Sequence, residues 1–176
     1  MSQLAAIRDA AARRGLEFLL IGGNAIIAYG VERETADVDF MVRREQSGGW
    51  QALLSELGYS VLHDGGTFLQ FTPPAASAWP VDLMIINEQT FGKLSASSRP
   101  LMLWGHEWRI PSPAHLVALK LHALMHGGKH RNLRDFLDVT GIVQHQRLDL
   151  NGPEMREIFE RYGSPELHRK VLLACA

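Results

Sequence analysis

Apolar residues in the first 110 positions come in short runs, each closed by glycine, proline or a polar turn. Short apolar runs and alternating apolar and polar residues are typical of strands, whereas apolar residues that recur every three or four positions are typical of helices. The pattern predicts helices over 2–14, 24–29 and 47–57. It predicts strands over 18–21, 37–42, 59–63, 67–72, 81–86, 101–104 and 107–110.

After Ser112 the pattern becomes helical. Serine followed by proline is a favoured helix start, because the serine side chain caps the first turn and proline fits its first position. Helices are expected over 113–125 and 132–144, and two more from about residues 153 and 165. We therefore expect an α/β core over residues 1–110 and a helical part over 111–176 that packs on it as one compact unit.

The composition narrows the class of protein. A chain of 176 residues is long enough to bury a core, and its net charge of −1 gives no support for a protein that coats long nucleic acids. The lone Cys175 excludes an intramolecular disulfide and a cysteine-based zinc site. The charged N-terminal segment is unlike a signal peptide, and no apolar run approaches the length of a membrane span. We expect a soluble, cytoplasmic protein without a membrane partner.

Candidate chemistry gathers between the first two predicted strands. Gly22-Gly23 would open a helix, where backbone N–H groups suit a phosphate, although an ordinary tight connection also explains a glycine pair. Asp37 and Asp39 are two apart on a predicted strand and would share a face. Adjacent carboxylates resist ionising together unless a cation lies between them, and oxygen ligands suit Mg²⁺. The alternative is two exposed acids on an edge strand; the combination with the glycine turn favours a metal–triphosphate site.

This arrangement resembles the nucleotidyltransferase superfamily of the DNA polymerase β type. Within it, GGNAIIAYG…RETADVDF is most similar to the minimal nucleotidyltransferases and the AbiEii-like toxins, which often carry Gly-Gly-x-Ala and then Arg-x-Thr. Those positions here are Gly22, Gly23, Ala25, Arg33 and Thr35. The resemblance covers residues 18–42 well, 80–86 fairly and 111–140 loosely. It implies a nucleotidyltransferase fold, in which a small, mixed, twisted sheet is flanked by helices and followed by a helical C-terminal part.

The resemblance also implies an active site. Asp37 and Asp39 would hold metal, while Asp82, the lone acid of an apolar strand, would complete the metal site and activate the acceptor hydroxyl. Two Mg²⁺ ions are expected, one of them arriving with the NTP. The expected phosphate and substrate contacts are Gly22, Gly23, Asn24, Arg33, Thr35, Lys120, Arg131 and Arg134.

Some of these residues near the glycine turn have ordinary alternatives. Asp82 could cap a neighbouring loop, and Arg33 and Thr35 could lie in a solvated turn. Many superfamily members have serine directly after the first glycine, whereas this chain has Gly23 and then Asn24. The Gly-Gly form occurs in the toxin-like branch, so this departure bears on the subfamily more than on activity.

The basic residues of the helical part also have two interpretations. Lys120 interrupts an apolar helix and could reach a triphosphate as a point charge. Related toxins have a Lys-Asp pair where this chain has Arg134-Asp135. Lys120, Arg131 and Arg134 could instead form helix-surface ion pairs, for example between Arg134 and Asp138.

Two further sets of ring side chains, three histidines and two tryptophans, are candidate metal ligands and candidate base-stacking residues, respectively. His122, His126 and His130 have the spacing of one helix face, but Gly127-Gly128 should end that helix, so a basic patch facing phosphate or RNA is favoured over a transition-metal site. Trp104 and Trp108 are expected to be core or cross-strand aromatics rather than base-stacking residues.

The implied function is Mg²⁺-dependent transfer of a nucleoside monophosphate from an NTP such as ATP to an acceptor hydroxyl. The acceptor would be an RNA 3′ end such as that of tRNA, or a protein side chain, and the protein could be a toxin with a cognate antitoxin or a phage-defence component. One alternative is a catalytically inactive member that binds a nucleotide or a partner protein. Another is a small-molecule nucleotidyltransferase of the antibiotic-modifying type. The sequence does not indicate the acceptor, the preferred base or the oligomeric state.

Overall fold

The computed structural model describes residues 3–127 and 132–176. The chain forms two compact units. The first, here called the sheet unit, contains Met1–Asn24 and Glu34–Pro111, and the second, the helical unit, contains Ala25–Arg33 and Ser112–Ala176. Residues 25–33 thus group with helices far later in the sequence, and the domain division after residue 110 stays a prediction.

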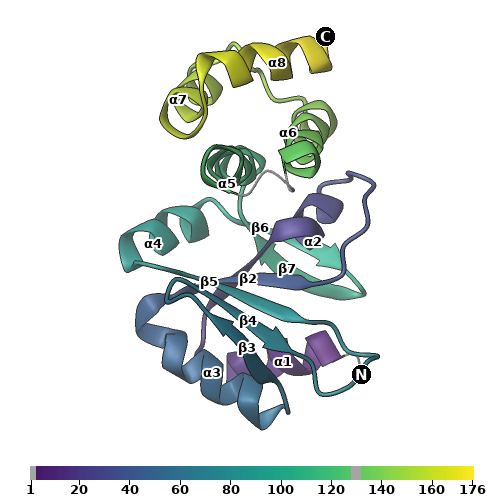
Figure 1. The fold of residues 1–176 in the computed structure, drawn as a ribbon, viewed down its shortest axis with the longest axis vertical. Coiled ribbons are helices and arrows are strands. Elements are labelled where there is room, and N and C mark those ends of the chain that lie inside the picture. Colours follow the sequence, from purple (N-terminus) through teal and green to yellow (C-terminus); the bar gives the residue numbers. More distant parts are fainter. Residues whose placement is uncertain (1–2, 128–131) are drawn as a thin grey trace. The chain divides into compact units, whose positions relative to one another are not determined.

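A five-stranded mixed sheet forms the centre of the sheet unit (Figure 1). Its order is β1-β2-β5-β4-β3, in which only β2 and β5 are parallel. The strands are β1 (Phe18–Ile21), β2 (Val38–Arg43), β3 (Ser60–Asp64), β4 (Phe68–Thr72) and β5 (Val81–Ile86). The five predicted strands are confirmed to within one residue at each end. Because β2 begins at Val38, Asp37 directly precedes it.

Helices and a second hairpin complete the sheet unit. Helix α1 (Gln3–Arg13) packs beside α3 (Ser47–Glu56), which follows a short 3-10 turn, η1 (Arg44–Gln46). Strands β6 (Arg99–Leu103) and β7 (His106–Ile110) form the separate hairpin. Its turn lies at Trp104-Gly105, both with positive φ, one position before the predicted Gly105-His106.

Helix α4 (Glu88–Ala96) was not predicted from the sequence. Its start is set by Asn87, whose side chain accepts a hydrogen bond from the Thr90 N–H at 2.8 Å. Arg43 of β2 pairs with Glu88 at 2.8 Å and lies over the Phe91 ring at 4.6 Å. The Arg43 contacts come from outside the helix, and the local signal that was available is the Asn87 cap.

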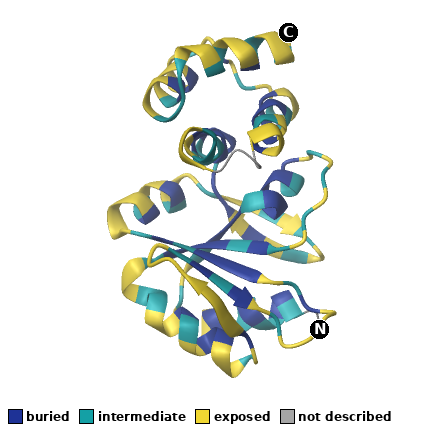
Figure 2. Cartoon of the chain, viewed as in Figure 1, coloured by how far each residue is buried: buried dark blue, intermediate teal, exposed yellow. Residues whose placement is uncertain are grey.

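The core of the sheet unit is rich in aromatic residues. Phe18, Phe40, Trp50 and Trp108 meet with ring centroids 4.9–6.1 Å apart, mostly edge to face, the favoured geometry for aromatic pairs. The prediction that Trp108 is a core aromatic is confirmed, since it is fully buried. Buried residues follow the central strands of the sheet (Figure 2). Trp104 packs edge to face on Trp108 at 5.7 Å.

Tyr59 gives the sheet unit an alkaline sensitivity. Its hydroxyl donates to the Trp79 carbonyl at 3.0 Å, and burial raises the pKa of Tyr59 to about 12. The unfolded chain loses this proton near pH 10, while the folded chain retains it, so the free energy of unfolding should fall as pH rises from about 10 towards 12. We expect Tyr59→Phe to weaken this alkaline loss in urea titrations. Equal alkaline loss in the variant and the wild-type protein would contradict the assignment.

Within the described residues, the helical unit contains four long helices and the segment 25–33. The helices are α5 (Pro113–His126), α6 (Asn132–Gln146), α7 (Pro153–Tyr162) and α8 (Pro165–Cys175), while α2 (Gly22–Ala28) starts in the sheet unit and ends in this one. Ser112 caps α5 as predicted, and Ser164 caps α8. Segment 25–33 packs on α6, where the Gln146 side chain donates to the Tyr29 carbonyl at 2.9 Å. None of the helices within 3–127 and 132–176 is long and apolar enough to cross a membrane.

Candidate active site

Two of the predicted catalytic carboxylates lie side by side on the sheet. Asp39 of β2 is paired in register with Asp82 of β5. Neighbouring strands lie about 4.8 Å apart and paired residues point to the same face, so the two carboxylates share one surface. Asp82 is only 4% exposed, whereas Asp39 is half-buried. Nothing in the local sequence predicts this register, because residues 39 and 82 are brought together by the parallel pairing of distant strands.

The glycine turn closes directly over Asp39. Ile21, the last residue of β1, is paired with Asp39, and Gly22 follows with φ +63°. A Cβ built on Gly22 would overlap the Asp39 carboxyl group. Only glycine therefore fits this position, both for its backbone conformation and for its approach to the carboxylate.

Asp37 is held from two sides just before β2. The Thr35 hydroxyl donates to Asp37 Oδ1 at 2.9 Å, and Asn24 Nδ2 donates to the Asp37 carbonyl oxygen at 2.8 Å. Asn24 is fully buried, and its Oδ1 has no hydrogen-bond partner within the described part of the chain. Thr35 and Asn24 thus fix the side chain and the backbone of Asp37, which places the start of β2 against the beginning of α2.

The acidic residues do not form a ready-made cage. Among residues 3–127 and 132–176, no three histidine, cysteine, aspartate or glutamate side chains are close enough together to hold one ion. Asp39 and Asp82 are nevertheless adjacent in register, and Asp37 lies one position before the same strand. A metal bound by these carboxylates would have to take its remaining ligands from a substrate or from water.

Gln70 is a site residue that the sequence analysis missed. It lies on β4 opposite Asp82, and its Nε2 donates to Asp82 Oδ2 at 3.1 Å. The available signal was its position as the polar centre of an otherwise apolar strand segment, FLQF. Its partner became visible only with the β4–β5 register.

The predicted phosphate contacts Arg33 and Lys120 lie in the helical unit, where both are paired with acids. Lys120 Nζ is 2.7 Å from both Asp135 and Asp138, and Arg33 is 2.6 Å from Asp138. Asp135 and Asp138 are buried, at 5% and 3% exposure. The four side chains form a network of two cations and two anions that joins segment 25–33 to α5 and α6.

The other residues predicted to contact phosphate or substrate either lie apart from the carboxylates in sequence or are not among the described residues. Arg134 is exposed on α6, and the acid four residues later, Asp138, is engaged by Arg33 and Lys120. Arg131 and His130 lie outside the described residues. The rings of His122 and His126 are 4.6 Å apart near the end of α5.

We expect the network around Lys120 to stabilise the helical unit. Lys120→Met would leave two buried carboxylates to one arginine, and we expect it to lower the free energy of unfolding by about 3–5 kcal/mol. Lys170 is the matched control, because it pairs with Glu166 at 2.8 Å but is exposed. Lys170→Met should have a much smaller effect in the same denaturant titration, since exposed ion pairs contribute little. Equal effects of the two substitutions would contradict a structural role for Lys120.

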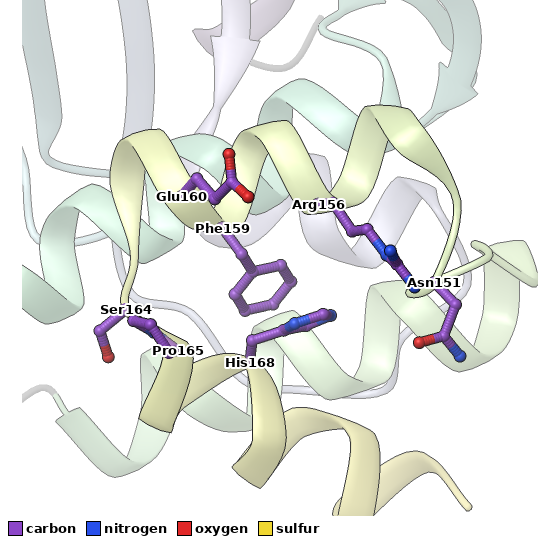
Figure 3. Close-up of a pocket in the computed structure, with 7 residues that line it drawn as sticks. All are labelled: Asn151, Arg156, Phe159, Glu160, Ser164, Pro165 and His168. Atoms are coloured by element: carbon purple, nitrogen blue, oxygen red, sulfur yellow. The ribbon is translucent and has the colours of Figure 1, made fainter.

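A separate cavity of about 310 Å³ lies between α7 and α8 (Figure 3). The rings of Phe159 and His168 face each other at its centre, 4.5 Å apart, and His168 Nε2 is 2.9 Å from the Leu150 carbonyl. The other lining residues are Asn151, Arg156, Glu160, Ser164 and Pro165. Asp37, Asp39 and Asp82 are not among its lining residues, so this cavity is not the candidate active site.

The chain is similar to known proteins in structure but not in sequence. No protein-family model matches the chain, and no curated protein sequence matches it. Solved structures do match: ANT(2")-Ia in complex with adenylyl-2"-tobramycin has a TM-score of 0.66 and 16% identity, covering 98% of this chain and 97% of that chain.

Two further solved structures are similar. The lincosamide antibiotic adenylyltransferase LnuA, bound to lincomycin, has a TM-score of 0.57 and 14% identity, covering 79% of this chain and 93% of that one. An antigenic nucleotidyltransferase-like protein from Paracoccidioides brasiliensis has a TM-score of 0.57 and 14% identity, covering 96% and 89%. Identities this low carry the architecture and not the activity, while the toxin-like branch stays a prediction. The expected architecture is confirmed: this chain has the nucleotidyltransferase fold.

Proposed function

We propose that this protein transfers a nucleoside monophosphate from an NTP to an acceptor hydroxyl. The observation that carries the proposal is the register of Asp39 beside Asp82, directly next to a glycine turn that admits no side chain at Gly22. In a chain with the nucleotidyltransferase fold, this is the place where paired carboxylates and phosphate-binding N–H groups would be expected to act together.

The donor set fits Mg²⁺. Asp37 and Asp39 offer hard oxygen ligands, and Asp82 lies in register beside Asp39. Mg²⁺ commonly uses one or two carboxylates and takes its other ligands from substrate phosphates and water, so the lack of a three-residue cluster among the described residues does not count against it. Asp37 and Asp39 would hold the ion, with Asp82 completing the site; when bound, Mg²⁺ would neutralise phosphate charge and lower the pKa of an acceptor hydroxyl.

The protein's own groups would serve the in-line displacement. The acceptor oxygen would form a bond to the α-phosphorus, the bond from that phosphorus to the bridging oxygen would break, and pyrophosphate would leave. Asp82 would accept the proton of the attacking hydroxyl. Backbone N–H groups at Gly22 and Gly23 would orient the phosphates, and Thr35 and Asn24 would keep Asp37 in place. Phosphate binding by Arg33, Lys120, Arg131 and Arg134 remains a further prediction.

A small-molecule acceptor is the second candidate. It is favoured by the extent of the match to ANT(2")-Ia, which covers almost the whole of both chains, including the helical unit, and whose structure contains an adenylylated antibiotic. An RNA or protein acceptor, and a toxin with a cognate antitoxin, are the interpretation that came from the sequence. Both share the same chemistry at the carboxylates and differ only in the acceptor.

The test is nucleotidyl transfer with each α-³²P-labelled NTP and Mg²⁺, offering tobramycin, lincomycin, total RNA and lysate protein as separate acceptors. Label transfer by the wild-type protein and not by Asp39→Asn would support the proposal and identify the acceptor class. Measurable NTP binding without release of pyrophosphate, whatever the acceptor, would instead favour the catalytically inactive alternative.

A further inference from the structure

Gln70 belongs to a row of polar side chains that crosses three neighbouring strands. It is paired with Asp82 in the antiparallel β4–β5 ladder, and Asp82 is paired with Asp39 in the parallel β2–β5 ladder. Paired residues point to the same face of a sheet, so Asp39, Asp82 and Gln70 follow one another across that face. The buried residues of β4, Leu69 and Phe71, point to the opposite side.

The chemistry of the contact is specific to an amide. A carboxylate oxygen can only accept and an amide nitrogen can only donate, so the 3.1 Å contact between Gln70 Nε2 and Asp82 Oδ2 orients both groups. An amide carries no charge, so Gln70 holds Asp82 without neutralising it. A lysine or arginine at position 70 would neutralise the carboxylate. Because Asp82 is almost completely buried, neighbouring side chains rather than bulk water determine its orientation.

We propose that Gln70 is a positioning residue that sets the rotation of the Asp82 carboxylate and thereby the rate of nucleotidyl transfer. This rests on the proposed function, in which Asp82 takes the acceptor proton. Proton transfer needs the two oxygens within about 2.6–3.2 Å of each other, and rotation about the Cβ–Cγ bond of an aspartate is soft unless a partner holds it. Gln70 lies on β4, whereas the glycine turn follows β1 at the far edge of the strand order. Loss of Gln70 should therefore slow the chemical step and leave NTP binding nearly unchanged.

The experiment compares Gln70→Leu with Thr72→Val. Gln70→Leu removes the donor and keeps most of the side-chain volume, while Thr72 is an exposed residue two positions along the same strand. We expect Gln70→Leu to lower kcat by about 10- to 100-fold, as for loss of a hydrogen bond to a charged group, with KM for the NTP changed less than threefold. Thr72→Val should change neither value. A kcat within twofold of wild type in Gln70→Leu would overturn the proposal, as would kcat and KM changing together.

A second variant and a second measurement keep the proposal testable if Gln70→Leu does not fold or if the wild-type protein is inactive. If Gln70→Leu fails to fold, Gln70→Met is assayed in the same way, because it keeps the length of glutamine, adds no charge and has no N–H donor. If the wild-type protein releases no pyrophosphate, the proposed function fails on its own. In that case crystal structures decide the positioning role: a rotated Asp82 carboxylate in the variant supports it, and an unchanged one overturns it.

Discussion

Asp39→Asn is expected to lose nucleotidyl transfer by about 1,000-fold or more while it folds as the wild-type protein does. The substitution keeps the size of a side chain that packs against Gly22 and removes only its charge. A loss of this size corresponds to about 4 kcal/mol of transition-state stabilisation, which is reasonable for a charged group that acts on a transferring phosphate. The rate of pyrophosphate release gives the activity, and the thermal transition shows whether the fold is retained.

The control for Asp39→Asn is Glu107→Gln, which removes one negative charge from an exposed position of β7 in the same unit. This variant should keep full activity. If Asp39→Asn retained more than a tenth of the wild-type rate, Asp39 could not be a metal-holding catalytic carboxylate, and the assignment of the site would have to be abandoned.

Gly22→Ala is expected to cost both stability and activity. The methyl group of an alanine at this position would overlap the Asp39 carboxyl group, and the alanine backbone would have to adopt a φ of +63°. Overpacking and left-handed backbone strain together should lower the free energy of unfolding by about 4 kcal/mol. Displacement of Asp39 should also reduce nucleotidyl transfer by at least about 100-fold, since small errors in placing a catalytic group are costly.

Two other glycines separate these causes. Gly15 has the same φ of +63° but nothing within 4 Å of an added Cβ, so Gly15→Ala should show the backbone strain alone, about 1 kcal/mol. Gly48 lies in helix α3 with open space around it, and Gly48→Ala should be neutral or slightly stabilising. Denaturant titration of the three variants should therefore rank Gly22, Gly15 and Gly48 in decreasing order of damage. A Gly22→Ala protein as stable as Gly15→Ala would show that the turn relaxes away from Asp39.

The sequence predicted what depends on local pattern. Alternating residues identified the strand that carries Asp39, and a nearly continuous apolar run identified the strand that carries Asp82. Ser112 and Ser164 marked helix starts that the structure confirms. The strand order was not available from local pattern, because it depends on the pairing of distant segments; the site was inferred through the family resemblance.

The same limit explains the residues that were missed. Gln70 is identified as a site residue by its hydrogen bond to Asp82 across the β4–β5 ladder. Helix α4 is held by an ion pair with Arg43 of β2. Lys120 stood out correctly as a cation in an apolar helix, but its partners Asp135 and Asp138 lie on the following helix. In each case the deciding interaction is tertiary and leaves little trace in the neighbouring sequence.

The single parallel pairing of the sheet has a consequence for how the protein acquires its site. Strands β1 and β2, and likewise β3, β4 and β5, pair antiparallel with near neighbours in the chain, so each set can form through contacts of short sequence separation. The β2–β5 ladder joins these two sets across a much longer loop, whose closure entropy must be overcome first. Asp39 and Asp82 sit on opposite sides of that junction. A folding intermediate without the β2–β5 ladder would therefore contain both strands that carry the carboxylates but would not bring Asp39 and Asp82 together.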